Sequence, residues 1–317
     1  MIVGVSTFGV AQAYRRSWTR RFGNDRTPTG FGALLAPVMV LGGAAVGLSG
    51  DLTLALALGG IGTLVYWFDD AFEMSARVRI ALAAVTGLAI GGCFLLDSGT
   101  SAPTAALLLA LIAFAHVALV NTINMQDGAD LNLATLLTLT ALLTIAFGQR
   151  TEWAAIGWVC LAFALPFAMV NRKPRSLYFG DSGCFALAVL FTTMGAAFLM
   201  GTRPPPPEVA IALGLPVSDM AFVTAHRIRI RQKFTVRHYF HLYQRLQKSQ
   251  NGFAYLLPQV ASVALALGIS SALQSMNLER VWAVAVATVA AGLIVFWIGH
   301  LAFVHGEPGP PAQRIPG

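Results

Sequence analysis

The sequence predicts an all-α fold, a polytopic integral membrane protein with about ten to eleven transmembrane helices. Hydrophobic residues make up 56% of the 317 residues and charged residues 11%, whereas a soluble domain carries about 25% charged residues. The mean hydropathy is +0.68. Apolar runs of about 20 residues, the length that crosses a bilayer core, recur along the whole chain.

The apolar runs lie near residues 1–14, 31–50, 52–68, 78–96, 103–120, 131–148, 153–170, 183–201, 207–225, 253–274 and 280–304. The first run is short for a hydrocarbon core of about 30 Å, because a helix rises roughly 1.5 Å per residue. We expect residues 1–305 to form a single transmembrane catalytic domain. The tail 306–317 is rich in Gly and Pro and is expected to be disordered.

The distribution of positive charge predicts the orientation. If the amino terminus is outside, all of the 21 Lys and Arg residues except Arg150, Arg203 and Arg280 fall on the inner side. This bias predicts a periplasmic amino terminus and a cytoplasmic carboxyl terminus. The longer, polar connections then lie on the cytoplasmic face, and we expect the active site there. The net charge of +7 fits this topology and contact with anionic lipid, and no soluble basic domain is present to bind nucleic acid.

Three acidic motifs follow apolar runs on that face. They are Asp69-Asp70, the stretch Asn121–Asp130, and Phe179-Gly180-Asp181-Ser182-Gly183. Carboxylates near a bilayer are costly, and two of them about 4 Å apart repel by roughly 4 kcal/mol at an effective dielectric of about 20. A cluster of acids therefore predicts a cation held between them. The pattern favours a metal-dependent enzyme that acts on an anionic substrate.

Asp69 and Asp70 end the third apolar run. Adjacent helical residues point about 100° apart, so one carboxylate can meet the substrate while the other orients a loop or caps the following helix. The alternative is that both only solvate a helix end.

The second motif carries amides and acids of the kind that Mg²⁺ or Mn²⁺ prefers. Asn121 and Asn124 are three residues apart at the end of the fifth run, and Asp127 and Asp130 lie in a turn that Gly128 permits. A polar turn at a helix end would have a similar composition.

The third motif places Asp181 between glycines at the start of a helix, where backbone can approach a phosphate. An aspartate that only caps the helix is the alternative. Tyr178 could offer a flat face to a base, or it could be an interfacial tyrosine.

A basic loop follows the ninth run and contains Arg237, His238 and His241. The two histidines would share a face if the segment were helical, and with Arg237 they suit phosphates better than zinc, which usually needs a third nitrogen or sulfur ligand. The alternative is the general excess of positive charge on the inner side.

Together these motifs resemble the polyprenyl-phosphate N-acetylhexosamine-1-phosphate transferases, the MraY/WecA-like enzymes of glycosyltransferase family 4. The resemblance rests on five motifs in order across nearly the whole chain: Asp69-Asp70, N-x-x-N-x-x-D-G-x-D from Asn121, G-D-x-G around Asp181, P-x-x-D ending at Asp219, and the late histidine loop. It implies transfer of a sugar 1-phosphate from a UDP-sugar to a membrane polyprenyl phosphate such as undecaprenyl phosphate, with release of UMP and with Mg²⁺ as cofactor, Mn²⁺ being the alternative ion.

The resemblance also implies roles for single residues. Asp181 corresponds to a metal-binding aspartate with Asn124 beside it, and Asp69 and Asp70 correspond to acids implicated in catalysis or in activating the lipid phosphate. Asp127 and Asp130 correspond to acids that line the nucleotide pocket, and Tyr178 corresponds to the aromatic that stacks on uracil. His238 and His241 correspond to the phosphate-handling histidine motif, and Asn121 and Arg237 would be further substrate contacts.

Three motifs depart from the family pattern. The histidine motif H-x-H-H reads His238-Tyr-Phe-His241, and the pattern D-G-x-D-G-L has Leu131 in place of its second glycine. The first cytoplasmic loop keeps only part of H-x-x-P-T-P. Glu73 stands where the muramoyl-pentapeptide branch has lysine, which favours the WecA-like branch and an N-acetylglucosamine or related N-acetylhexosamine donor.

The expected protein is therefore a multi-pass enzyme of the bacterial inner membrane that initiates cell-envelope glycan synthesis. Three alternatives stay open: a phospho-N-acetylmuramoyl-pentapeptide-type transferase, a family member that binds without turnover, and a transporter. Direct attack by the lipid phosphate and a two-step route through an aspartyl phosphate cannot be separated from sequence, and a homodimer is left open.

Overall fold

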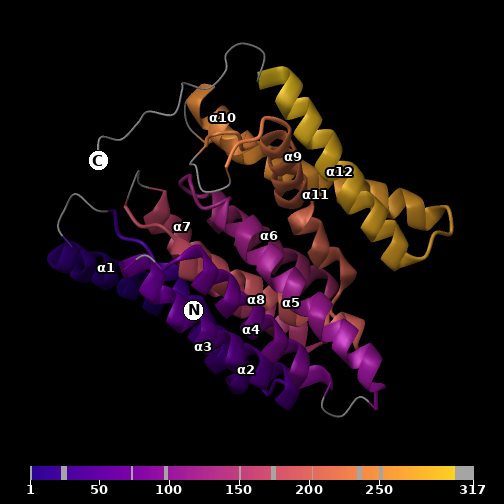
Figure 1. Cartoon of the computed structure of the whole chain (residues 1–317), viewed down its shortest axis with the longest axis horizontal. Helices are drawn as coiled ribbons and strands as arrows, with labels where there is room; N and C mark the ends of the chain where they lie inside the picture. The colour runs from indigo at the N-terminus through magenta and orange to yellow at the C-terminus, as the bar shows by residue number, and fades with distance from the viewer. Residues whose placement is uncertain are drawn as a thin grey trace. The chain divides into compact units, whose positions relative to one another are not determined.

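The computed structural model describes residues 2–22, 27–72, 74–95, 99–149, 151–172, 176–201, 203–233, 238–249 and 253–303. Every regular element in these ranges is helical, which confirms the predicted all-α class (Figure 1). The chain divides into two compact units, Met1–Pro206 and Pro207–Gly317. The single catalytic domain over 1–305 stays a prediction, and the tail 306–317 lies outside the described residues.

The first unit contains eight α-helices and one short 3-10 helix among its described residues. They are α1 (Ile2–Phe22), η1 (Phe31–Leu34), α2 (Leu35–Val46), α3 (Gly50–Phe72), α4 (Ala76–Leu95), α5 (Ala102–Asn124), α6 (Asn132–Phe147), α7 (Glu152–Asn171) and α8 (Gly180–Leu199).

The second unit contains four α-helices and two 3-10 helices in the part that the structure describes. They are η2 (Pro207–Leu213), α9 (Gly214–Arg229), α10 (Leu242–Ser249), η3 (Ala254–Leu256), α11 (Leu257–Ser275) and α12 (Arg280–Phe303). Arg280 at the start of α12 forms a bidentate ion pair with the buried Glu208 of η2, at 2.7 and 2.8 Å.

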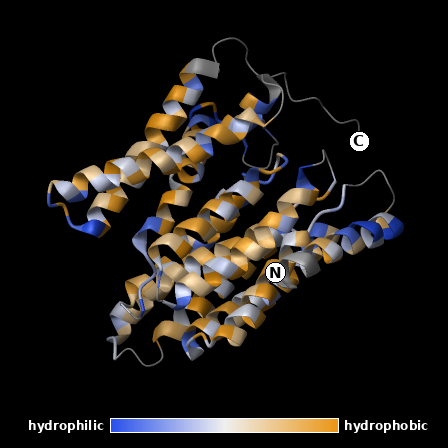
Figure 2. Ribbon diagram, turned by 180° about the vertical axis from the view of Figure 1, so that it is seen from behind, coloured by the Kyte–Doolittle hydropathy of each residue, from blue (hydrophilic) through white to orange (hydrophobic). Residues whose placement is uncertain are grey.

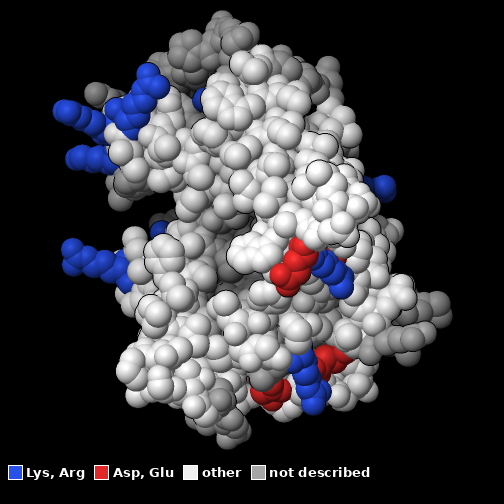
Figure 3. All heavy atoms as spheres, turned by 90° about the vertical axis from the view of Figure 1, so that its right-hand side faces the viewer, with Lys and Arg blue, Asp and Glu red and all other residues white. Residues whose placement is uncertain are grey.

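Eight described helices are long and apolar enough to cross a membrane, and two shorter apolar helices span Phe31–Val46 and Asn132–Phe147. Hydrophobic residues run along the helices in Figure 2, and most of the face in Figure 3 carries no charge. Surfaces of this kind face lipid. The chain is a polytopic membrane protein, while the number of crossings and the side on which each terminus lies stay predictions.

Helix α8 is the centre of the first unit. It packs against α3, α4, α5 and η1, and 16 of its 20 residues are buried. Small residues along it let neighbouring helices approach closely. One of these contacts is polar, because His116 of α5 lies 2.8 Å from the Thr192 hydroxyl, between Nδ1 and Oγ1.

The helices extend further than the apolar runs that predict them, and this extension carries the acidic motifs. Helix α3 continues to Phe72 and α5 to Asn124, and α8 begins at Gly180. Asp69, Asp70 and Asn124 therefore lie in last turns and Asp181 in a first turn, where helix geometry fixes their directions better than a loop would.

Glycines allow η1 to lie against the first turn of α8. A Cβ on Gly183 would lie 2.5 Å from Cδ1 of Phe179 and 2.7 Å from Cα of Gly32. Real Cβ atoms do not approach other atoms so closely, so the close contact between the η1 and α8 backbones requires a glycine at this position.

We expect G183A to destabilise the protein by about 1–3 kcal/mol, the usual cost of adding volume to a packed contact. Thermal unfolding in detergent measures the effect. The matched control is G195A in the same helix, where a Cβ meets nothing within 4 Å, and it should leave the melting temperature unchanged or raise it. Equal effects of the two substitutions would contradict the close packing of η1 on α8.

Candidate active site

The candidate site is built around the first turn of α8 in the first unit. Gly180 has φ +83°, in the left-handed region that glycine favours, and a Cβ there would lie 2.2 Å from the nitrogen of Gly30. The backbone before α8 pairs with the segment before η1: the Tyr178 N–H donates to the Pro28 carbonyl at 2.8 Å, and the Gly32 N–H donates to the Phe179 carbonyl at 2.9 Å. These contacts fix where α8 begins.

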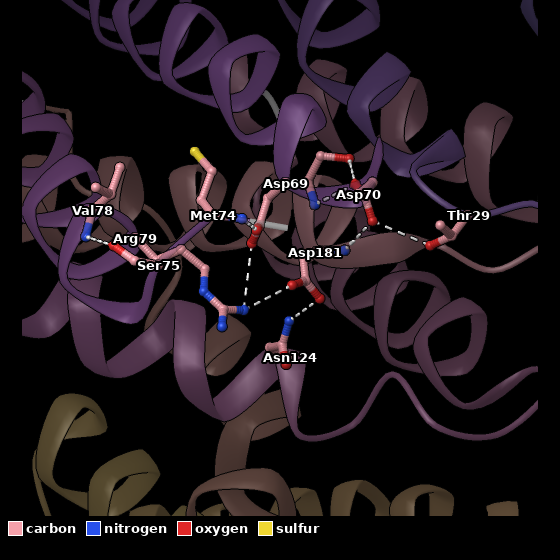
Figure 4. Close-up of polar contacts among 10 residues, drawn as sticks. Thr29, Asp69, Asp70, Met74, Ser75, Val78, Arg79, Asn124 and Asp181 are labelled. Carbon is pink, nitrogen blue, oxygen red and sulfur yellow. Dashed lines mark hydrogen bonds and ion pairs between the residues drawn. The ribbon is translucent and has the colours of Figure 1, made fainter. Parts of the chain in front are cut away.

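Asp70 of α3 caps the amino terminus of α8. Its carboxylate accepts the backbone N–H of Asp181 at 2.9 Å, and the N–H and hydroxyl of Ser182 at 3.0 and 2.6 Å. The Thr29 hydroxyl donates a fourth hydrogen bond at 3.2 Å (Figure 4). Helix amino termini leave such N–H groups unsatisfied, so this carboxylate holds α3 and α8 together.

Asp127 caps the same helix from the turn between α5 and α6. Its Oδ2 accepts the Gly180 N–H at 2.7 Å. The pKa of Asp127 is raised to about 7, mainly by burial; the bond from Gly180 opposes this rise, and the charges of Asp181 and Asp70 add to it.

The N–H groups of residues 180–182 therefore donate to protein carboxylates. The sequence favoured these amides as a phosphate contact. In the structure Asp127 and Asp70 use them instead, because both carboxylates reach the helix end.

Asp69 points away from its neighbour Asp70, as adjacent helical residues do. Its Oδ1 accepts the Met74 N–H at 2.5 Å. Its Oδ2 is buried and forms no hydrogen bond, and it lies 3.4 Å from Nη1 of Arg79. The same Nη1 donates to Oδ2 of Asp181 at 3.2 Å, so one guanidinium bridges the two acids (Figure 4).

Asn124 completes this cluster from the last turn of α5, and its Nδ2 donates to Oδ1 of Asp181 (Figure 4). Asn121 lies one turn earlier, is exposed, and donates its Nδ2 to the Val117 carbonyl at 2.7 Å. The structure thus brings Asn124 to Asp181 and leaves Asn121 bonded to its own helix.

Buried Asn171 at the end of α7 links two of the predicted motifs. Its Oδ1 accepts the N–H of Leu131, the residue after half-buried Asp130, at 2.5 Å. Its Nδ2 donates to the carbonyl of Leu177, the residue before half-buried Tyr178, at 2.6 Å. Asp130 and Tyr178 are therefore held by backbone contacts next to the cluster, and their predicted nucleotide contacts stay predictions.

The second unit contains a separate buried pair. Asp219 of α9 lies with its Oδ2 2.8 Å from Nδ1 of His241, and its Oδ1 accepts the Leu242 N–H at 3.0 Å. His241 is 2% exposed, and its Nε2 is buried without a hydrogen bond. The ring of His238 lies 5.1 Å from that of His241. The segment 238–240 is not helical, so the two rings are neighbours without sharing a helix face, and Arg237 and Glu73 lie outside the described residues.

Residues 52–199 match the family model described as glycosyl transferase family 4. The chain is thus similar to that family over this region. The predicted resemblance is confirmed, and the range runs from the first turn of α3 to the end of α8, so it contains Asp69, Asp70, Arg79, Asn124 and Asp181.

The chain also matches curated proteins, at low sequence identity. They are proteins named undecaprenyl-phosphate alpha-N-acetylglucosaminyl 1-phosphate transferase from Escherichia coli O157:H7, Escherichia coli strain K12 and Shigella flexneri. Each is 26% identical over 199 residues, which cover 56% of this chain and 53% of the relative. The chain thus spans about half the length of the curated relatives it matches.

Two residues of the glycosyl transferase family 4 region were missed by sequence reasoning. Arg79 is one of many basic residues on the predicted inner side, and only its place at the start of the helix after Asp69-Asp70 could have singled it out. Asn171, an amide at the end of an apolar run, could have been singled out in the same way, by its place at a helix end. Asn and Asp at such helix ends often satisfy nearby backbone groups.

We expect His238 of the second unit to make stability depend on pH. The pKa of His238 is lowered to about 4, mainly by burial, with a contribution from the charges of His241 and Arg227 and against the opposing charge of Asp219. The stability from a neutral His238 is present above about pH 6.5 and is lost as the pH falls towards about 4. Melting curves in detergent should show H238Q losing less stability over this range than the wild type, and parallel curves would contradict the lowered pKa.

Proposed function

We propose that the protein transfers a sugar 1-phosphate from a UDP-sugar to a polyprenyl phosphate in the membrane. An oxygen of the polyprenyl phosphate attacks the β-phosphorus of the UDP-sugar, the bond from that phosphorus to the bridging oxygen breaks, and UMP leaves with that oxygen. The product is a polyprenyl diphosphate sugar. The observation that supports this most is the cluster of Asp69, Asp181 and Asn124, which three helix ends of a glycosyl transferase family 4 region bring together.

The cluster fits a divalent cation. Two carboxylate oxygens, one of them buried and without a hydrogen bond, face one positively charged group, and an amide lies against Asp181. In the described ranges no group of three or more His, Cys, Asp or Glu could hold a metal. Mg²⁺ needs no such cage, because it keeps several waters and binds through one or two carboxylates and substrate phosphates. We propose Asp181 and Asn124 as the residues that hold Mg²⁺, with Mn²⁺ as the alternative.

When bound, the ion would neutralise charge on the diphosphate and on the departing UMP. The residues around it have distinct tasks. Asp70 holds Asp181 in place through the first turn of α8, and it has little capacity left to act as a nucleophile. The second pKa of a phosphate monoester is about 6, so the polyprenyl phosphate is largely ionised at neutral pH and needs no strong base. We therefore propose an electrostatic task for Asp69.

The remaining predicted residues would bind substrate. Asp127 and Asp130 lie in the turn after α5, and Tyr178 lies before α8, so a nucleotide beside Asp181 could reach both segments. His238 and His241 would handle phosphate groups, and Asp219 would orient His241 through Nδ1. Nε2 of His241 is buried and has no hydrogen bond within the protein.

The names of the relatives specify undecaprenyl phosphate and N-acetylglucosamine. We propose a donor of the same class, UDP-N-acetylglucosamine or a related UDP-N-acetylhexosamine, and undecaprenyl phosphate as the acceptor. A panel of UDP-sugars with undecaprenyl phosphate in detergent, read by UMP release, tests the donor. UMP exchange into UDP-sugar without lipid phosphate would favour the two-step route.

We expect D181N to abolish UMP release, by at least a hundredfold in kcat, because it removes the carboxylate that faces both Asn124 and Arg79. D69N should also lose activity while the folded protein remains. The matched control is D51N, which changes an acid in the first turn of the same helix as Asp69, at the far end from the site. Full turnover by D181N would rule out the metal assignment. If even the wild type released no UMP from any UDP-sugar, the result would support a family member that binds substrate without catalysis.

A further inference from the structure

The guanidinium of Arg79 supplies the positive charge that the two neighbouring carboxylates need. Its Nη1 lies 3.4 Å from Oδ2 of Asp69 and 3.2 Å from Oδ2 of Asp181. Oδ2 of Asp69 is buried and has no hydrogen bond, so this guanidinium is its counter-charge. A buried carboxylate without a partner is strongly unfavourable.

We propose that Arg79 is the internal counter-cation of the acidic cluster, and that it and a divalent cation compete for Asp69 and Asp181. The inference rests on the metal site of the proposed function. It adds Asp69 as the second carboxylate that faces the ion, and it assigns to Arg79 the task of keeping the site folded and neutralised when no ion is bound.

The exposure of the side chains indicates which group gives way. The side chain of Asp69 is 3% exposed and that of Arg79 is 40% exposed. Asp69 is also held by the Met74 N–H, whereas a long arginine side chain can turn its charged end into water at small cost. The arriving ion and the guanidinium repel each other, and the mobile partner is the arginine.

Competition makes two linked predictions, because the free energy that the ion needs to displace a protein group reduces the affinity for the ion. Without Arg79 the ion should bind more tightly, since nothing has to be displaced. Without both Arg79 and the ion the folded protein should be less stable, since Asp69 and Asp181 then lie uncompensated. Saturating ion should remove that loss of stability.

A static structural bridge behaves differently. If Arg79 only joined α4 to α3 and α8, its loss would lower the melting temperature by the same amount with and without the ion. If it only contacted substrate, its loss would change neither the melting temperature of the free protein nor the affinity for the ion.

The test uses the full chain in detergent, with Mn²⁺ as the probe. Free Mn²⁺ is measured by electron paramagnetic resonance to obtain the dissociation constant, and thermal unfolding is recorded with chelator and with saturating Mn²⁺. For R79Q we expect a dissociation constant about tenfold lower than that of the wild type, within the usual range for coupled ligands. Its melting temperature should be lower than that of the wild type in chelator and equal to it in saturating Mn²⁺.

Two further variants keep the test decisive. R77Q removes an exposed arginine from the same first turn of α4, and it should match the wild type in both measurements. R79K keeps a positive charge that can reach the acids, so its gain in affinity should be smaller than that of R79Q. If R79Q is too unstable to purify without ion, purification in Mn²⁺ followed by chelation gives the same comparison.

Three results would overturn the inference: unchanged Mn²⁺ affinity in R79Q, a deficit in melting temperature that persists at saturating Mn²⁺, or an equal gain in R77Q. A failure of the metal site itself looks different, because the wild type and R79Q would then both fail to bind Mn²⁺.

Discussion

The capping of α8 by acidic side chains is the interaction on which the rest of the site depends. The first N–H groups of a helix have no partner within the helix, and the first turn of α8 is largely buried, so these groups need partners from the protein. Asp70 and Asp127 supply them from two other segments. The caps fix the register of α8 against α3 and the α5–α6 turn. Asp181, one residue into the helix, then has a defined direction.

The same arrangement concentrates negative charge, and this charge has to be balanced. Asp70 and Asp127 cap α8, Asp181 lies in its first turn, and Asp69 lies close by. The guanidinium of Arg79 balances the charges of Asp69 and Asp181. The acidic cluster is thus a structural joint, and we propose that it is also a cation site. A divalent ion that replaces Arg79 would change the charge of the site without changing the caps.

The apolar runs predicted the helices closely, because burial or lipid contact along about 20 residues leaves the chain few other structures. The resemblance likewise singled out Asp69, Asp70, Asn124 and Asp181, which the structure brings into one network. The contact of Arg79 could not be predicted, because it depends on how the first turn of α4 packs beside the last turn of α3. The use of the α8 amides by Asp70 and Asp127 depends in the same way on tertiary packing.

The departure at Leu131 shows a further limit of sequence reasoning. The family pattern has a glycine at this position, and Leu131 has φ +64°, a conformation that glycine adopts more readily. The turn keeps its shape because Asn171 holds the Leu131 N–H. A missing glycine therefore need not mean a missing turn.

Hydrogen–deuterium exchange of the peptide that spans residues 180–183 tests the central interaction most directly. If Asp70 holds these amides, D70A should speed their exchange by about tenfold, which corresponds to roughly 1.4 kcal/mol of lost local stability, while D51A should leave it unchanged. Equal exchange of this peptide in the wild type and D70A would contradict the capping of α8 by Asp70.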